Sequence, residues 1–294
     1  MDILQHLRNE ADIVNAHLDH LLPSGEGLAA TVIEAMRYST QAGGKRIRAA
    51  MVRAAAQTFG APKEHVLPTA CGIEMIHAAT LIHDDLPCID DGDLRRGKPS
   101  CHRVFGEATA LLAGDALLIA GLRAIATQSP PFGPERVAGT VAEVADLAGI
   151  GGVIAGEAVD IEAEGQPPDP DTLAFIHDRK TAALFRAAVR AGAILAGAPE
   201  SGLQALTEYA TALGLAFQVT DDILDVVGDP EATGKQTGTD AEKGKLTYPA
   251  VWGLEGARTR AEELAEDARG AAARLPANGD FWSTLVDFVV AREY

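Results

Sequence analysis

Two acidic clusters lie far apart in the chain, and each follows directly on an apolar run with helical spacing. The first cluster has five aspartates within ten residues and is followed at once by Arg95 and Arg96. Carboxylates are rarely buried beside apolar helices unless they are paired or bound to a metal. The clusters therefore predict a fold that brings them together as a divalent-metal site for a polyphosphate. Their members are Asp84, Asp85, Asp90, Asp91 and Asp93 in the first cluster and Asp221, Asp222 and Asp225 in the second.

The composition favours a helical protein. Of the 294 residues, 47% are hydrophobic and only 5% are aromatic, and alanine, leucine and glycine dominate. Alanine and unbranched side chains lose little conformational freedom in a helix. No segment of the sequence shows the steady alternation of a strand, and no linker divides it. We therefore expect one all-α domain over residues 1–294, with helices at about 2–22, 28–41, 45–58, 65–86, 106–127, 135–164, 172–196, 201–227, 249–274 and 279–291.

Charge and cysteine content narrow the class of protein. The net charge of -17 argues against a nucleic-acid partner, so cations must lie between this chain and any phosphorylated substrate. The three cysteines show no metal-ligand spacing and indicate reduced thiols. The N-terminus is no signal peptide, and no run approaches about 18 uninterrupted apolar residues. We therefore expect a cytoplasmic protein without a transmembrane segment.

Around the first cluster, helical spacing places His77, Thr80 or Leu81, and Asp84 on one face. Pro87 breaks this helix, and the break is expected to return Asp90 towards Asp84. For His77, a structural role in the core is the alternative to a role in the site.

In the second cluster, Asp221 and Asp225 are four residues apart and share a face with Gln218. Asp222 is turned about 100° away from them. An ordinary acidic helix end is the alternative, but the apolar neighbours of these residues favour a buried setting.

Three basic features allow two interpretations each. Gly43 and Gly44 precede Lys45, Arg46 and Arg48, which form either a solvated turn or an anion site at a helix start. Lys180 lies in an apolar helix and either extends to solvent or faces a site, and Asp171 or Thr172 caps that helix. The long segment 228–249 carries Lys235 and Lys245 and is either a lid or a plain loop.

Taken together, these residues resemble the trans-isoprenyl diphosphate synthases, also called polyprenyl synthetases. The resemblance covers about residues 25–255 and departs from the family pattern at Ala49, where proline is frequent. The first cluster also carries a two-residue insertion, Leu86–Pro87, found in many bacterial and plant-like members. Four segments match in order: Gly43–Arg48, Asp84–Gly97, Lys180–Thr181, and Gly214–Asp225 followed by Lys235 and Lys245.

The resemblance implies a bundle of long antiparallel helices around a deep central cavity, usually as a homodimer. It implies Mg²⁺-dependent condensation of isopentenyl diphosphate with an allylic diphosphate, with three Mg²⁺ ions per active site. Carried over by position, Asp84, Asp90 and Asp221 bind metal, with Asp85, Asp222 and Asp225 as further ligands or their supports. Arg95, Lys180, Lys235 and Lys245 hold the allylic diphosphate. Gly44, Lys45, Arg48, His77 and Arg96 hold isopentenyl diphosphate, and Thr181 and Gln218 line the reacting centre.

Product length should depend on the residues one turn before Asp84, because one isoprene unit is about as long as a helical turn, ~5 Å. Ala79 and Thr80 stand there, and both are small. They favour geranylgeranyl diphosphate (C20) as the product, with farnesyl diphosphate (C15) as the alternative. A terpene cyclase should lack the Gly-Gly-Lys-Arg segment and the second acidic motif. A catalytically silent partner subunit should have lost acidic or basic residues.

Overall fold

The computed structural model of the chain describes residues 1–128, 130–228, 238 and 243–291. Most of these residues are helical, and the prediction of an all-α fold is confirmed. The helices are α1 (Ile3–Leu21), α2 (Ala30–Thr40), α3 (Ile47–Thr58), α4 (Leu67–Asp84), α5 (Cys101–Phe105), α6 (Glu107–Ala126), α7 (Pro134–Ala148), α8 (Val153–Ala163), α9 (Pro170–Ile176), the π-helix η1 (His177–Ala182), α10 (Ala183–Ala196), α11 (Glu200–Val227), α14 (Tyr248–Ala272) and α15 (Gly279–Val290).

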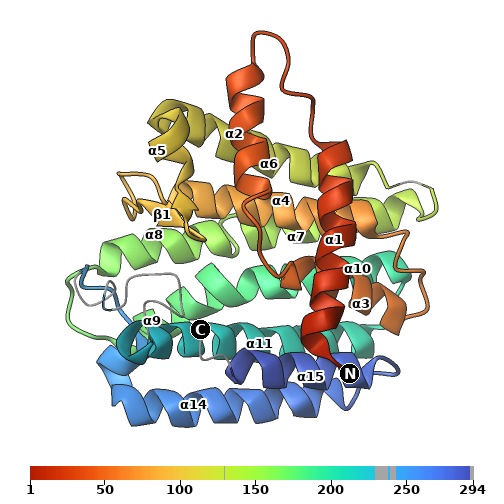
Figure 1. Cartoon of the computed structure of the whole chain (residues 1–294). Coiled ribbons are helices and arrows are strands. Elements are labelled where there is room, and N and C mark those ends of the chain that lie inside the picture. The colour runs from red at the N-terminus through yellow and green to blue at the C-terminus, as the bar shows by residue number, and fades with distance from the viewer. Residues whose placement is uncertain (129, 229–237, 239–242, 292–294) are drawn as a thin grey trace.

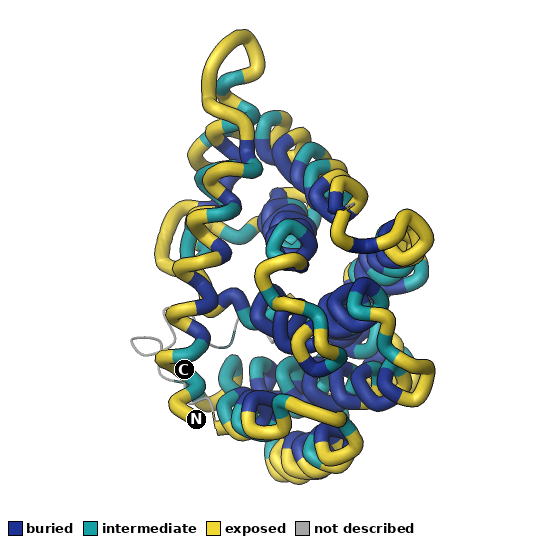
Figure 2. The backbone as a smooth tube through the Cα atoms, turned by 90° about the vertical axis from the view of Figure 1, so that its right-hand side faces the viewer, coloured by how far each residue is buried: buried dark blue, intermediate teal, exposed yellow. Residues whose placement is uncertain are grey.

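Long helices run side by side through the molecule, with α6 and α4 at one end of the stack and α11 and α14 at the other (Figure 1). Helix α4 packs on α6, α10 packs on α3, α7 and α11, and α11 packs on α14. Helix α1 crosses in front and contacts α3 and α4. The helices in the middle of this stack are buried along most of their length (Figure 2). Helices from α1 to α15 contribute to one hydrophobic core, which favours the expectation of a single domain.

Small residues let the central helices approach closely. A Cβ atom on Gly72 or Gly121 would lie 2.6 Å from the carbonyl oxygen of the other, where α4 crosses α6. A Cβ atom on Gly156 of α8 would lie 2.2 Å from the backbone nitrogen of Lys180. Glycine at these positions therefore fixes how near α4 lies to α6 and how near α8 lies to the segment that carries Lys180.

One predicted helix is two in the structure. The continuous helix expected over 135–164 is interrupted between α7 and α8. At Gly152 the backbone is non-helical, and a Cβ atom there would lie 2.0 Å from the carbonyl oxygen of Leu147. The backbone at Gly152 lies so close to the preceding turn that it leaves no room for a side chain.

The helix expected at 172–196 also differs from the prediction. It starts at Pro170, and Asp169 rather than Asp171 or Thr172 caps it, accepting a 2.9 Å hydrogen bond from the Thr172 backbone. Its middle is the π-helix η1. A π-helical turn is rare and changes the direction of the side chains that it carries, here including Lys180.

The segment after the first acidic cluster holds two elements that the sequence patterns did not predict. The two-residue strands β1 (Leu94–Arg95) and β2 (Lys98–Pro99) form an antiparallel hairpin, and the short helix α5 follows. The hairpin is tied to α2, because the Tyr38 hydroxyl donates a 2.7 Å hydrogen bond to the Pro99 carbonyl.

Two stretches of the described chain are long and apolar enough, by composition, to cross a membrane. They are Glu107–Ala126 and Pro134–Ala163. In this fold α6 packs against α4 and α2, and the second stretch is interrupted between α7 and α8. The first stretch is therefore a packed helix of this fold, and the second forms two separate helices of it.

Candidate active site

The first acidic cluster begins where α4 ends. Asp84 is the last residue of the helix, and it is half-buried, as are His77, Thr80 and Leu81 one and two turns earlier. Most of the remaining surface of α4 is buried, so these residues form the face that helical spacing predicted. The backbone N–H of Asp90 donates a 2.9 Å hydrogen bond to the Asp84 carbonyl. The prediction that the break returns Asp90 to Asp84 is confirmed.

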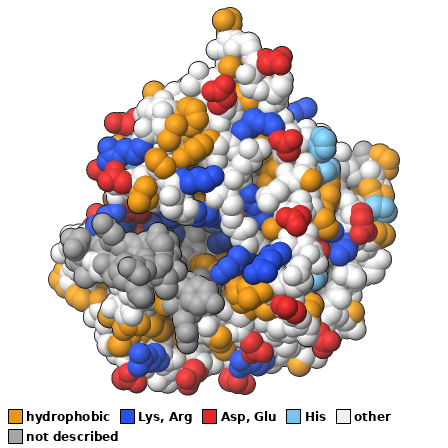
Figure 3. Space-filling view, in the orientation of Figure 1, with side chains coloured by type: hydrophobic (Ala, Val, Ile, Leu, Met, Phe, Trp, Pro, Cys, Tyr) orange, Lys and Arg blue, Asp and Glu red, His pale blue; other side chains and the backbone are white. Residues whose placement is uncertain are grey.

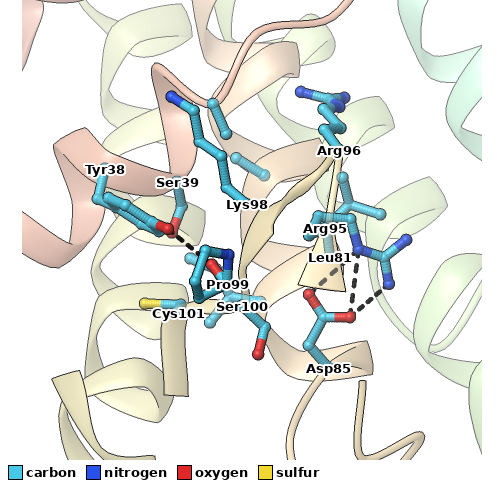
Figure 4. A pocket seen from close by; sticks show the side chains of 13 residues that line it. Tyr38, Ser39, Leu81, Asp85, Arg95, Arg96, Lys98, Pro99, Ser100 and Cys101 are labelled. Carbon is cyan, nitrogen blue, oxygen red and sulfur yellow. Dashed lines mark hydrogen bonds and ion pairs between the residues drawn. The ribbon is translucent and has the colours of Figure 1, made fainter. Parts of the chain in front are cut away.

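Asp85 is turned away from Asp84 and pairs with Arg95. The Asp85 side chain is 3% exposed and lies 2.5 Å from the Arg95 guanidinium. Figure 4 shows Arg95 of the hairpin pointing at Asp85, whereas Arg96 points away from it. The hairpin therefore separates the two arginines, and Asp85 fixes the position of one of them.

The second acidic cluster lies on α11. Asp221 and Asp225 are half-buried, whereas Asp222 is buried, so Asp222 differs in environment from the two residues that the helical spacing places on another face. Asp222 accepts a 2.8 Å hydrogen bond from the Gln218 amide and a 2.9 Å hydrogen bond from the Tyr248 backbone. It therefore connects α11 to the start of α14.

Thr181 and Gln218 lie together, although they are far apart in the sequence. The Thr181 hydroxyl donates a 2.6 Å hydrogen bond to the Gln218 carbonyl oxygen. The other end of the Gln218 amide is held by Asp222, so the orientation of this side chain is defined by both contacts. His177, also on η1, lies 3.4 Å from the Asp222 carboxylate.

Lys180 and Lys245 converge on Asp160 of α8, a residue that we did not predict for the site. Lys180 Nζ lies 2.6 Å and Lys245 Nζ 3.1 Å from the same Asp160 oxygen. Lys180 also pairs with Glu157 at 2.8 Å. Lys245 also lies 2.9 Å from Asp90, so it links α8 to the first acidic cluster. We call Lys180, Lys245 and the carboxylates Asp84, Asp90, Glu157, Asp160 and Glu164 the mixed-charge group.

Neighbouring charges shift the pKa values of the residues in this group. Burial, and then the neighbouring Glu157, raise the pKa of Asp84 to about 7, whereas Lys180 and Arg95 act in the opposite direction. Burial alone would lower the pKa of Lys180, but Asp160, Asp84 and Glu157 raise it above the ordinary value. Lys180 therefore stays charged and forms ion pairs with Glu157 and Asp160.

A second set of cations lies beside α3 and α4. Arg48 Nη1 is 3.3 Å from His77 Nε2, and the Arg48 guanidinium lies 4.5 Å from the centre of the Phe185 ring. Arg96 donates to the Gly43 carbonyl. Gly44 has a φ of 119°, which favours glycine, and the Arg96 guanidinium lies directly beside it. Lys45 of the same segment lies 4.8 Å from the centre of the Phe288 ring. We call Arg48, His77 and Arg96 the cationic group.

No carboxylate of the described residues lies within ion-pairing distance of Arg48 or Arg96. Burial lowers the pKa of Arg48 to about 10, so this side chain remains charged near neutral pH. Burial and then Arg48 hold the pKa of His77 well below its usual value, which keeps the imidazole neutral. This concentration of positive charge is suited to an anion. Lysines and arginines surround a hollow near the middle of the face seen in Figure 3.

The acidic residues fit Mg²⁺ that arrives with a diphosphate. Within the parts of the chain that the structure describes, no three His, Cys, Asp or Glu side chains converge as a ready metal site. Mg²⁺ is usually held by one or two carboxylates together with substrate phosphates, so such a cage is not needed. Asp84 and Asp225 lie at or near the C-terminal ends of α4 and α11, where the helix dipoles also favour cations.

Several of the predicted site residues are thus brought together in two neighbouring groups, to which Asp221, Asp222 and Asp225 of α11 do not belong, and Lys235 lies outside the described residues. Sequence reasoning missed the acidic residues of α8. Their signal was present, because Glu157, Asp160 and Glu164 are three and four residues apart and share one helical face.

The comparisons with known proteins agree with the resemblance. The family model described as polyprenyl synthetase matches residues 29–275. The chain is 45% identical over 273 residues to the heterodimeric geranylgeranyl pyrophosphate synthase large subunit 1 of Arabidopsis thaliana, covering 91% of this chain and 73% of that one. It is 42% identical over 262 residues to the farnesyl diphosphate synthase of Bacillus subtilis, covering 89% and 88%.

A solved structure shares the whole fold. The geranyltransferase of Helicobacter pylori, complexed with magnesium and isoprenyl diphosphate, superimposes with a TM-score of 0.84 at 28% identity. The match covers 99% of this chain and 97% of that one. On the family match and these likenesses, the chain belongs to the polyprenyl synthetase family.

Proposed function

We propose that this protein is a Mg²⁺-dependent short-chain trans-prenyltransferase that joins isopentenyl diphosphate to an allylic diphosphate. The observation that carries the proposal is the pair of neighbouring charged groups. One combines Lys180 and Lys245 with carboxylates, and the other presents Arg48 and Arg96 without a carboxylate partner among the described residues. The reaction uses two diphosphates, one that leaves its substrate and one that stays attached. Two groups with different charge surroundings match this difference.

Asp84, Asp90, Asp221 and Asp225 are the oxygen ligands that we assign to Mg²⁺. When bound, Mg²⁺ would neutralise the diphosphate oxygens and favour their departure. Asp85 and Asp222 hold Arg95 and Gln218 in place, and we assign them a supporting role. The family pattern of three ions can be checked by titrating metal against turnover.

The allylic diphosphate is bound by Arg95, Lys180 and Lys245, with Lys235 as a further candidate. Cations placed around the departing oxygens stabilise the charge that develops when the C–O bond breaks. In that step the electron pair leaves with the diphosphate, and a carbocation remains on the allyl group. Lys180 and Lys245 exchange their contacts with Asp160 for contacts with the diphosphate.

Isopentenyl diphosphate is bound by Gly44, Lys45, Arg48, His77 and Arg96. Its double bond attacks the carbocation, a new C–C bond forms, and a proton is then lost. Because the His77 nitrogen already faces Arg48, we assign the proton to the released diphosphate. The Thr181 and Gln218 oxygens lie close together and line the centre where the positive charge forms.

The proposed product is geranylgeranyl diphosphate, with farnesyl diphosphate as the alternative. Thr80 is half-buried on the accessible face of α4, whereas Ala79 is fully buried. The small side chain of Thr80 therefore leaves space one turn below Asp84, along the path that we assign to the growing tail. Thr80→Tyr should shorten the product, and Ala79→Tyr should do so only by displacing its neighbours.

Product analysis tests the whole proposal. The enzyme is incubated with Mg²⁺, isopentenyl diphosphate and, in turn, dimethylallyl, geranyl and farnesyl diphosphate, and the products are separated by chain length. Elongation to C20 supports the assignment, and a halt at C15 favours the farnesyl alternative. A cyclic hydrocarbon formed without isopentenyl diphosphate would indicate a terpene cyclase. An absence of turnover with every starter would indicate a silent partner subunit.

We also propose that the chain forms a homodimer through α6. Leu112 and Ile119 are 54% and 69% exposed, and they lie two turns apart on one face of that helix. Exposed apolar side chains gathered on one face are typical of protein interfaces. Light scattering should give twice the mass of one chain, and Leu112→Glu with Ile119→Glu should yield monomers.

A further inference from the structure

Arg46 lies between Lys45 and Arg48 in the sequence but belongs to a different environment. It is only 4% exposed, although a solvated basic turn was one of the two interpretations of this segment. We propose that Arg46 and Glu74 form a buried pair that positions the isopentenyl diphosphate subsite without contacting the substrate. This inference rests on the proposed function and adds two positioning residues to it.

The backbone of Arg46 is held in an unusual conformation. Its φ and ψ are 49° and 39°, in the left-handed region that residues other than glycine seldom adopt. Such a conformation persists only where the surroundings determine it. The Arg46 side chain donates to Asn15 Oδ1 of α1 at 2.9 Å, to the Thr40 carbonyl, and to Glu74 Oε2 of α4 at 3.4 Å. Three helices thus fix one residue.

Glu74 completes the start of α3. The N-cap residue of α3 is Arg46, whose side chain has no acceptor atom. The first N–H groups of a helix need acceptors, which the N-cap side chain usually supplies. Here Glu74 Oε1, from α4, accepts a 3.0 Å hydrogen bond from the Ala49 backbone. Its other oxygen pairs with Arg46, so one carboxylate caps α3 and fixes the residue before it.

The pair sets the position of the cationic group. Arg48 lies in the helical turn that Glu74 caps, and Lys45 directly precedes Arg46. His77 is one turn beyond Glu74 on α4 and lies 3.3 Å from Arg48. The distance between Arg48 and His77 therefore depends on how α3 begins relative to α4. Lys180 and Asp160 belong to other elements and do not contact this pair.

Because the pair is buried, we expect it to contribute more to the position of α3 relative to α4 than to the free energy of unfolding. Both side chains are 2% exposed, and desolvation offsets much of the attraction between such charges. Two apolar side chains could fill the same volume, but they could not accept the Ala49 hydrogen bond. Removing one partner leaves the other charge buried alone and should displace the start of α3.

Steady-state kinetics of full-length variants test the inference. Glu74→Gln keeps an acceptor for Ala49 but removes the charge that faces Arg46, and Asn15→Ala removes a single contact of Arg46. Arg190→Gln is the matched control, because Arg190 forms a half-buried ion pair with Glu143, at 2.5 Å, between α10 and α7. Circular dichroism confirms folding of each variant, and KM is measured separately for isopentenyl and geranyl diphosphate.

We expect the KM for isopentenyl diphosphate to rise about tenfold in Glu74→Gln and about threefold in Asn15→Ala, while the KM for geranyl diphosphate changes less than about twofold. Arg190→Gln should leave both values unchanged. Equal changes in both KM values, or a fall in kcat alone, would overturn the inference. If Glu74→Gln fails to fold, the result for Asn15→Ala decides. Failure of the wild-type protein to consume isopentenyl diphosphate would overturn the proposed function instead.

Discussion

The mixed-charge group and the cationic group would offer an anion different surroundings. In the first, Lys180 and Lys245 each lie within 3.1 Å of Asp160. In the second, no carboxylate among the described residues pairs with Arg48 or Arg96. A diphosphate that enters the first group must displace carboxylates from the lysines, and those carboxylates then need other cations. A diphosphate that enters the second group meets positive charge directly.

Under the function that we propose, this difference lets one protein use metal for one diphosphate and side chains for the other. Carboxylates released from Lys180 and Lys245 are oxygen ligands next to an incoming phosphate, a setting that Mg²⁺ prefers. The cationic group offers nitrogen donors only, which do not bind Mg²⁺. The negative net charge of the chain is thus compatible with two anionic substrates, because positive charge is concentrated where it is needed.

The largest effect should come from removing a metal ligand. Asp84→Asn should lower kcat by about 10³-fold, or about 4 kcal/mol of transition-state stabilisation, because a neutral amide cannot replace the carboxylate on Mg²⁺. Asp91→Asn is the control, since Asp91 is exposed and, within the described part of the chain, pairs with Arg103 and His102 rather than with the mixed-charge group. Turnover is measured with geranyl and isopentenyl diphosphate. An equal loss in both variants would contradict the assignment of Asp84.

Removing the metal should separate the two groups directly. With a chelator present, the affinity for a non-ionising thiolo analogue of geranyl diphosphate should fall about 100-fold, since carboxylates then repel the phosphate. The affinity for isopentenyl diphosphate should change less than about threefold. Titration calorimetry with and without Mg²⁺ measures both values. The proposed contrast is wrong if both ligands lose affinity to the same extent.

Replacing one cation in each group should change a different kinetic constant. Lys180→Met should lower kcat about 100-fold, because Lys180 acts on charge that develops as the bond breaks. Arg48→Met should instead raise the KM for isopentenyl diphosphate about tenfold, since it binds a diphosphate that does not leave. The two variants control for each other in the same assay. Similar effects on the same constant would show that the groups are not functionally distinct.

Local periodicity was sufficient to predict much of this site. The spacing along α4 identified the face with His77 and Asp84, and the spacing along α11 separated Asp221 and Asp225 from the buried Asp222. These predictions succeeded because a helix fixes the relative direction of its own side chains. The break at Pro87 was equally local.

What the sequence did not reveal depends on contacts between elements. Glu157 and Asp160 shared a visible helical face, but nothing local indicated that Lys180 and Lys245 would reach it. In the sequence Arg46 was one of three similar cations. In the structure its backbone is left-handed and its side chain contacts Glu74. The interruption before α8 arises from a close backbone approach at Gly152. The periodicity of the sequence does not report any of these contacts.

The smallest expected effect is on the pH dependence of stability, and it arises from His77, which the folded protein keeps neutral. Burial and Arg48 hold the pKa of His77 well below 6.5, so the folded protein stabilises the neutral ring. Below pH 6.5 the unfolded chain binds a proton at this residue that the folded chain does not. Stability is therefore fully present above that pH and decreases as the pH falls towards the folded-state value, by at most about 1.4 kcal/mol per pH unit for one proton.

Urea unfolding between about pH 7.5 and about pH 5.5 measures this contribution. The free energy of unfolding of His77→Gln should depend less steeply on pH than that of the wild type. His65→Gln serves as the control, because His65 is exposed and lies outside the cationic group. An unchanged slope in His77→Gln would mean that neither burial nor the positive charge of Arg48 and Arg96 lowers the pKa of His77. The contrast between the two groups would then lose its electrostatic basis at this residue.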